Sequence, residues 1–289
     1  MSRVALATCR ELPDLDDDDQ LIAPALAALG ITATPAIWDD PAVDWAAFDL
    51  VVVRNTWDYV ARLPAFLAWA RSLPRLINPA AVLAWSTDKR YLAELHDAGL
   101  PVVPTWFLAA GEVLPAVGEL VVKPSVGVGS IGARRFREAE HEAAAAHARA
   151  LEADGRVAMV QPYLRGVEDG RGETALIVLG GELSHAIHKG PLLGGEPAET
   201  FADGLYLLER VAPREPTAAE RAVGERVLAW VTERFGPLPY ARIDVIPGPP
   251  AADEEPVVLE VELVEPSLFL GTAPGAPERL AAVLAAALG

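Results

Sequence analysis

Hydrophobic positions in the first third of the chain fall into short β-like runs separated by a helical segment. Residues 4–7 and 50–54 predict strands, and the alanine- and leucine-rich residues 20–29, which stop at Gly30, predict a helix. Alternating strands and helices are typical of βαβ units, which build a parallel sheet. We therefore expect an α/β domain over residues 1–84.

Two polar groups flank these elements. Ligands of open α/β sheets bind at the carboxyl ends of strands, so Arg54, Trp57, Asp58 and Tyr59 are candidates to face a substrate. The four aspartates at positions 16–19 precede the helix, where its positive end favours carboxylates. We interpret these aspartates as a solvated face and assign them no chemistry.

The pattern changes near Trp85, after a link punctuated by prolines. A β-like run over residues 120–132, a helix rich in alanine and glutamate and a second β-like run over residues 157–164 predict a small α+β unit, at residues 85–164. The last unit, residues 165–289, contains three further β regions, at residues 174–189, 240–246 and 257–270. Residues 247–256 (PGPPAADEEP) predict an exposed hairpin loop.

Composition excludes several function classes. Hydrophobic residues make up 52% of the 289 positions, enough apolar surface for a folded chain. A net charge of −17 repels nucleic-acid phosphates and anionic lipids, and no apolar stretch reaches the roughly 20 residues of a membrane helix. The single cysteine, Cys9, favours a reducing compartment, the cytoplasm, and predicts a small buried residue. We expect a small-molecule substrate and a monomer or homodimer.

A glycine-rich segment, VVKPSVGVGSIG, follows a predicted strand in the middle unit. Glycine lets backbone N–H groups approach phosphate oxygens closely, and a lysine adds positive charge. The segment matches neither GxxxxGK[ST] nor a GxGxxG after the first strand, so a hairpin with an incidental lysine is the alternative. Its candidate phosphate-binding residues are Lys123, Ser125, Gly127, Gly129 and Ser130.

Three carboxylates occur in the last predicted strands, at Asp244, Glu260 and Glu262. Because side chains alternate along a strand, Glu260 and Glu262 share one face. Their repulsion in an apolar run needs an offsetting cation, and hard oxygen ligands suit Mg²⁺. These residues are candidate metal ligands, and salt bridges to Arg242 or Lys189 are the alternative.

A third element is the strand-to-loop turn MVQPYL, followed by acids. Backbone groups at such a turn can bind an adenine edge, and an acid beyond it can accept hydrogen bonds from ribose hydroxyls. The candidates are Gln161, Pro162, Tyr163, Leu164 and Glu168, with Asp169 as an alternative to Glu168. A strand followed by an ordinary loop is the other interpretation.

These motifs occur in one order, and residues 78–270 resemble ATP-grasp ligases of the glutathione-synthetase and ribosomal-modification type. The resemblance implies an α/β (α+β) fold of three subdomains, with ATP held between two α+β units. By this resemblance, Lys89 and Lys123 bind the ATP phosphates, residues 161–164 bind adenine, and Glu168 binds the ribose. The same resemblance implies that two Mg²⁺ ions are held by Asp244, Glu260 and Glu262.

Further segments are similar to the O-ureidoserine cyclo-ligases that close the ring of cycloserine. They read TCRELPDLDDDD at residues 8–19, IWDDPAVDWAAFDLVVVRNTWDY at 37–59, INPAAVLAWSTDKRYL at 77–92, SHAIHKGP at 184–191 and EVELVEPSLFL at 260–270. The segment after Lys189 departs from the family pattern, because residues 190–209 lack the arginine signature that relatives carry there. The similar segments imply a role in antibiotic biosynthesis and an amino-acid-like substrate.

The implied reaction activates a carboxylate as an acyl-phosphate, which a nitrogen nucleophile converts to an amide with release of ADP and phosphate. Lys189 and Arg242 are the candidate catalytic residues, because phosphoryl transfer depends on charge stabilisation. The alternatives are intermolecular ligation of amino acids or peptides and a catalytically silent ATP-binding module. A nicotinamide-dependent dehydrogenase is disfavoured, since Thr8, Cys9 and Arg10 replace the glycines it would need after residues 4–7. His185 and His188 receive no role.

Overall fold

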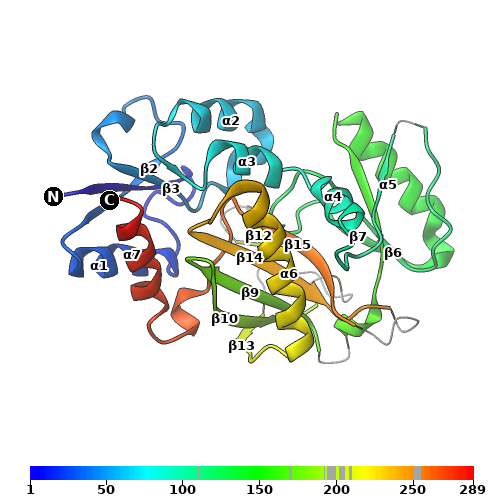
Figure 1. The fold of residues 1–289 in the computed structure, drawn as a ribbon. Helices are drawn as coiled ribbons and strands as arrows, with labels where there is room; N and C mark the ends of the chain where they lie inside the picture. The colour runs from blue at the N-terminus through cyan, green and yellow to red at the C-terminus, as the bar shows by residue number, and fades with distance from the viewer. Residues whose placement is uncertain are drawn as a thin grey trace.

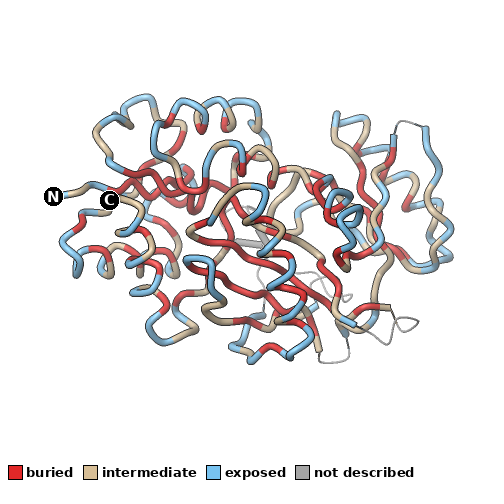
Figure 2. The backbone as a smooth tube through the Cα atoms, viewed as in Figure 1, coloured by how far each residue is buried: buried red, intermediate tan, exposed pale blue. Residues whose placement is uncertain are grey.

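Three sheets form the framework of the molecule (Figure 1). The computed structural model describes residues 1–109, 111–168, 171–191, 193, 200–201, 206–207, 210–249 and 255–289. Each of the three sheets lies within one of the three expected units. Buried residues are concentrated along the strands, and the exposed ones lie on the outer faces of the helices (Figure 2). No helix in the described ranges combines the length and the apolar character needed to cross a bilayer.

The amino-terminal sheet has the strand order β2-β1-β3-β4, and all its pairs are parallel, as the βαβ pattern predicts. Helix α7 packs beside α1 although it comes from the end of the chain (Figure 1). Its elements are β1 (Arg3–Thr8), α1 (Ile22–Ala28), β2 (Thr32–Ile37), β3 (Leu50–Val53), α2 (Leu63–Ser72), β4 (Leu76–Ile77) and the packed α7 (Ala276–Ala286).

The central sheet is antiparallel, in the order β5-β8-β6-β7, with α5 on one face. The apolar side of α5 buries Ala144, Ala148 and Leu151 against Leu120 and Val122, which gives this unit its own core. The expected strand 120–132 ends early, and a glycine-rich loop leads into the next strand. The elements are β5 (Trp106–Leu108), β6 (Leu120–Pro124), β7 (Arg134–Phe136), α5 (His141–Ala153) and β8 (Ala158–Pro162).

The third sheet has five strands in the order β13-β10-β9-β14-β15, all antiparallel, and α6 runs across one face (Figure 1). Thr217 and Glu220 form a capping box that starts α6. Residues 250–254 of the expected hairpin loop lie outside the described residues. The elements are β9 (Glu173–Leu179), β10 (Glu182–Lys189), β13 (Val211–Pro213), α6 (Ala218–Phe235), β14 (Tyr240–Ile246) and β15 (Val257–Glu262), and a separate pair comprises β11 (Thr200–Phe201) and β12 (Tyr206–Leu207).

The amino-terminal sheet and the five-stranded sheet share a core. Ile177 of β9 packs in the same cluster as Leu6 of β1, while its neighbour Leu176 packs on the other face, with α6. The buried hydroxyl of Tyr240 lies 3.0 Å from the carbonyl oxygen of Val53 and 2.9 Å from that of Val264, so it bridges the two units. The core between α5 and the central sheet is largely separate from this shared core.

Two short helices connect the amino-terminal and central units. They are α3 (Ala80–Ser86) and α4 (Tyr91–Asp97), and Lys89 lies in the turn between them. Leu92 and Leu95 of α4 are buried in a cluster made mainly by the five-stranded sheet and α6, which Met159 of the central sheet also joins. Packing of α4 and α7 therefore crosses the expected boundaries, and the division at residues 84 and 164 stays a prediction.

Candidate active site

Two adjoining cavities lie where the sheets meet. The larger, of about 430 Å³, is bounded by the glycine loop, β14, β15 and the amino-terminal domain, and the smaller, of about 130 Å³, is bounded by β8 and the segment that follows it. Lys123, Ser130, Glu173, Lys189 and Leu259 line both cavities. The smaller cavity therefore adjoins charged residues of the larger one.

The larger cavity brings together most of the predicted site. Its lining includes the predicted residues Lys89, Lys123, Gly127, Gly129, Ser130, Lys189, Arg242, Asp244, Glu260, Glu262, Trp57 and Tyr59. The smaller cavity adds Gln161, Pro162, Tyr163 and Leu164. Ser125 and Glu168 line neither. Ser125 is buried beneath the glycine loop, where its carbonyl oxygen accepts a hydrogen bond from the Lys89 backbone at 2.8 Å.

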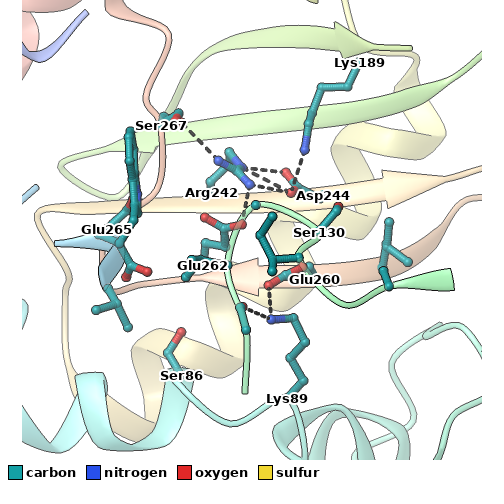
Figure 3. A pocket seen from close by; sticks show the side chains of 18 of the residues that line it. Ser86, Lys89, Ser130, Lys189, Arg242, Asp244, Glu260, Glu262, Glu265 and Ser267 are labelled. Atoms are coloured by element: carbon teal, nitrogen blue, oxygen red, sulfur yellow. Dashed lines mark hydrogen bonds and ion pairs between the residues drawn. The ribbon is translucent and has the colours of Figure 1, made fainter. Parts of the chain in front are cut away.

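Antiparallel pairing of β14 and β15 assembles the charged wall of the cavity. Arg242 lies opposite Glu262 and Asp244 lies opposite Glu260 in the register, so the side chains two residues apart on each strand share one face. The Arg242 guanidinium donates to Asp244 at 2.9 Å and also pairs with Glu262 (Figure 3). The salt bridge to Arg242, which is the alternative to metal binding, is thus present among these carboxylates.

The pKa values of two neighbouring carboxyls, Asp244 and Glu262, are shifted in opposite directions. Burial raises the pKa of Asp244, but the positive charges of Arg242 and Lys189 outweigh it and hold that pKa below its ordinary value. Lys189 Nζ lies 3.7 Å from Asp244 and 2.7 Å from Glu173. Burial, together with repulsion from Glu260 and Asp244, raises the pKa of Glu262 to about 7.

Two lysines stand at the glycine loop. Lys89 Nζ lies 2.9 Å from Glu260 and donates at 2.7 Å to the carbonyl oxygen of Gly127, so this ion pair ties the loop to β15. Gly129 supports the turn of the loop with φ at +56°, a conformation that glycine adopts at little cost. Burial and the nearby charges of Lys89 and Lys189 lower the pKa of Lys123 to about 8, although Glu260 and Glu173 oppose that shift.

The candidate metal ligands are paired with cations. No three histidine, cysteine, aspartate or glutamate side chains within the described ranges converge as a ready-made metal site. Instead Glu260 contacts Lys89, while Asp244 and Glu262 contact Arg242. The donor set still fits Mg²⁺, because carboxylate oxygens on adjacent strands line one cavity and a cation would offset their mutual repulsion.

Polar contacts hold the residues around the smaller cavity. Gln161 is buried and its side-chain amide donates to the Thr105 hydroxyl at 2.9 Å. The Tyr163 hydroxyl donates to Glu168 at 3.1 Å, and the Arg135 guanidinium lies over the Tyr163 ring, 3.6 Å from its centroid. A hydrogen bond from Arg135 lowers the pKa of Glu168, which therefore stays ionised. Asp169, the alternative ribose acid, lies outside the described residues.

Two residues expected to face a substrate do not line the cavity. Arg54 is only 1% exposed, because it donates from Nε at 3.0 Å to Asp19 and from its terminal nitrogen at 2.7 Å to the carbonyl oxygen of Pro266. Asp58 accepts a hydrogen bond from Trp38 Nε1 at 2.8 Å and pairs with Arg62. The 3-10 helix Trp57–Arg62 turns Asp58 toward Trp38, while Trp57 and Tyr59 reach the cavity.

The aspartates before α1 were also wrongly interpreted as a solvated face. Asp19 is 2% exposed and is the ion-pair partner of Arg54. Asp18 accepts hydrogen bonds from the backbone N–H groups of Leu270 and Gly271, each at 2.8 Å. Both Asp16 and Asp18 line the larger cavity, because the chain folds back onto the loop that follows β15.

Sequence reasoning missed two acids of the site. Glu173 on β9 lies opposite Lys189 on β10 and pairs with it. Alignment of the two strands around their GG turn would not have given this contact, because a bulge between Leu183 and His185 shifts the register by one residue. Glu265 follows β15 and lines the larger cavity, and the only signal was its position three residues after Glu262.

Comparison with known proteins identifies the family. A family model for the amino-terminal domain of the D-cycloserine synthetase DcsG matches residues 4–78. The cycloserine biosynthesis protein DcsG of Streptomyces lavendulae is 36% identical over 305 aligned residues, which cover 99% of this chain and 98% of that protein. The chain belongs to the DcsG family.

Solved structures agree with this assignment. The crystal structure of D-cycloserine synthetase DcsG matches with a TM-score of 0.89 and 35% identity, over 100% of both chains. The ATP-grasp ligase PsnB, in complex with its minimal precursor, matches with a TM-score of 0.63 over 99% of both chains; at 19% identity it shows the fold alone. This member of the DcsG family therefore has the ATP-grasp fold and is an ATP-dependent ligase, as expected from its sequence.

Proposed function

We propose that this DcsG-family enzyme closes the ring of an O-ureidoserine-like amino acid, using ATP to activate its carboxylate. The observation that carries the proposal is the pair of adjoining cavities, which share Lys123 and Lys189. The smaller cavity suits adenine, and the larger one suits the phosphates and an amino-acid-like substrate. Membership in a family whose relatives make cycloserine supports ring closure over other ligations.

In this proposal ATP spans both cavities. Adenine occupies the smaller cavity against residues 161–164. Glu168 does not line that cavity, but Arg135 and Tyr163 hold it beside residues 161–164, from where it would reach the ribose. Lys89 and Lys123 attract the phosphates, and backbone N–H groups around Gly127, Gly129 and Ser130 approach them from the glycine loop. Asp244, Glu260 and Glu262 would hold two Mg²⁺ ions, which would neutralise phosphate charge.

The reaction proceeds in two displacements. A substrate carboxylate oxygen attacks the γ-phosphorus of ATP, the bond to the β-phosphate oxygen breaks, and ADP leaves. The acyl-phosphate formed is a better electrophile than the carboxylate, so the substrate nitrogen attacks its carbonyl carbon. Collapse of the resulting oxyanion breaks the bond to the phosphate oxygen, the nitrogen gives up one proton to the departing phosphate, and the amide remains. Lys189 and Arg242 stabilise the negative charge on the phosphoryl group and on the oxyanion.

Several further expectations accompany the proposal. A buried single cysteine fits a reducing compartment, and we propose a cytoplasmic enzyme of antibiotic biosynthesis. A monomer or homodimer stays a prediction. A silent ATP-binding module is disfavoured, because lysines and carboxylates occupy both sides of the larger cavity.

The test is substrate-dependent release of ADP by the purified enzyme with Mg²⁺. O-ureidoserine alone should stimulate release, and mass spectrometry should show loss of the open-chain amino acid and appearance of a cyclic product. Release that requires a pair of amino acids would replace ring closure with intermolecular ligation. If neither single amino acids nor pairs stimulate release, the proposal is wrong.

A further inference from the structure

Glu265 is a buried acid of the larger cavity to which the proposed reaction gives no role. It lies three residues beyond Glu262, where the chain leaves β15, and only 6% of it is exposed. Figure 3 places it beyond Glu262, on the side of the cavity away from Lys189. It thus lies at the end of the cavity that faces the amino-terminal domain.

Glu265 differs from the neighbouring acids in its ion pairs. The other buried or half-buried acids on this wall each have a cationic partner: Lys89 for Glu260, Lys189 for Glu173, and Arg242 for Asp244 and Glu262. Within the described part of the chain, no lysine or arginine forms an ion pair with Glu265. The Tyr59 hydroxyl is close enough to lower the pKa of the Glu265 carboxyl, against the larger effect of burial.

The burial of Glu265 and the acids around it favour the binding of a cation at this position. Burial of an ionised carboxylate is costly unless an opposite charge compensates for it. Burial, with repulsion from Glu262, raises the pKa of Glu265 to about 8. A ligand that brings its own positive charge would relieve both effects.

The amino-terminal domain holds this loop in place from both sides of the acid. Trp57 Nε1 donates to the Glu265 carbonyl oxygen at 3.1 Å, and Arg54 donates to the next carbonyl, of Pro266, at 2.7 Å. Arg54 is itself fixed by Asp19. Buried contacts therefore hold the backbone that carries the Glu265 side chain.

We propose that Glu265 binds the ammonium group of an amino-acid substrate and so selects amino acids over simple carboxylic acids. This inference rests on the proposed ligase function. In that function the substrate carboxylate lies near Arg242 and Lys189, and an α-amino acid carries its ammonium group a few ångströms from its carboxylate. Arg242 contacts Glu262, and the charge of Glu262 acts in turn on Glu265, which lines the same cavity, so one small molecule can present its carboxylate to Arg242 and its ammonium to Glu265.

Binding measurements test the assignment directly. Calorimetry would compare O-ureidoserine with its deamino analogue, 3-(ureidooxy)propanoate, on the full chain with Mg²⁺ and a non-hydrolysable ATP analogue. We expect the amino form to bind at least about tenfold more tightly to the wild type, as for a partly desolvated charge pair. Glu265→Gln should remove this difference, while binding of the deamino analogue stays the same. Glu233→Gln, on the exposed face of α6, is the matched control.

Kinetics distinguish recognition from a structural or chemical role. Glu265→Gln should raise the KM for the amino acid and leave the KM for ATP unchanged, and Glu265→Asp should recover part of the loss. Thermal unfolding and ATP binding would verify that each variant is folded. A folded Glu265→Gln variant that still prefers the amino form would overturn the assignment, as would a loss confined to kcat. Absence of any amino-acid-stimulated ADP release by the wild type would instead overturn the proposed function, and this inference with it.

Discussion

Two buried arginine–aspartate pairs of similar geometry have different surroundings. Arg242 and Asp244 stand on one strand and line the larger cavity, where Glu262 and Lys189 also contact them. Arg54 and Asp19 are 1% and 2% exposed and are enclosed by Asn55 and the backbone of Pro266. The first pair can exchange partners with a ligand, whereas the second can only hold the protein together. Burial of a charge pair therefore does not identify a catalytic residue, but the space beside it can.

The largest expected effect is the loss of ADP formation when an acid of the larger cavity is replaced. Glu260→Gln removes the charge that pairs with Lys89 and that would hold metal, so Mg²⁺-dependent ADP formation should fall about 1,000-fold or more, as when charge stabilisation of a transition state is lost. Initial-rate assays would measure it, with Glu225→Gln on the exposed face of α6 as control. Unchanged turnover in a folded variant would refute the metal assignment.

The arginines themselves should separate stability from turnover. Arg54→Met leaves Asp19 buried without its cation, so the free energy of unfolding should fall by about 3–5 kcal/mol. Arg242→Met should lose less stability, since Asp244 keeps Lys189 nearby, but should lose nearly all turnover.

Urea denaturation and ADP-release assays on both variants would measure these changes. The double variant Arg54→Met/Asp19→Leu should regain most of the lost stability. A mild stability loss for Arg54→Met, together with a larger one for Arg242→Met, would reverse the distinction between the pairs.

A smaller effect should appear with pH at Lys123. Burial lowers the pKa of this lysine to about 8, so its charge is complete below that pH and is lost above it. ATP favours the charged form, and its dissociation constant should therefore rise with pH above 8, by at most about tenfold per pH unit. Titrations between pH 7 and 9 would measure it. Lys123→Met should bind ATP weakly at every pH, and persistence of the same slope in that variant would assign it to another group.

The smallest effect concerns Cys9, which is fully buried beside the first strand. Burial raises the pKa of its thiol to about 12, so the reactive thiolate is scarce in the folded protein. A thiol-specific reagent at pH 8 should label unfolded protein within minutes and leave the native enzyme unlabelled and fully active. Rapid labelling of native protein would show that this strand end opens readily.

Strand periodicity made the centre of the site predictable. Spacing by two placed Glu260 and Glu262 on one face, and the structure adds Asp244 and Arg242 from the paired strand. Contacts formed by irregular segments could not be foreseen in the same way. Asp19 meets Arg54 across 35 positions of sequence, and Glu265 leaves a strand end whose direction depends on contacts with another domain. A loop's position is set by such distant partners, which no local pattern encodes.

Contacts around Tyr240 have a mechanical consequence. Its hydroxyl bridges Val53 and Val264, and Asn78 donates to the backbone of Tyr240 and of Leu263 at 3.1 and 2.8 Å. These bonds join the amino-terminal sheet and the five-stranded sheet into one block, while the central sheet keeps a core of its own. The cavity walls that these two sheets contribute are thus braced against each other by buried hydrogen bonds, whereas the central unit meets the five-stranded sheet through apolar packing that includes Met159 and Phe107.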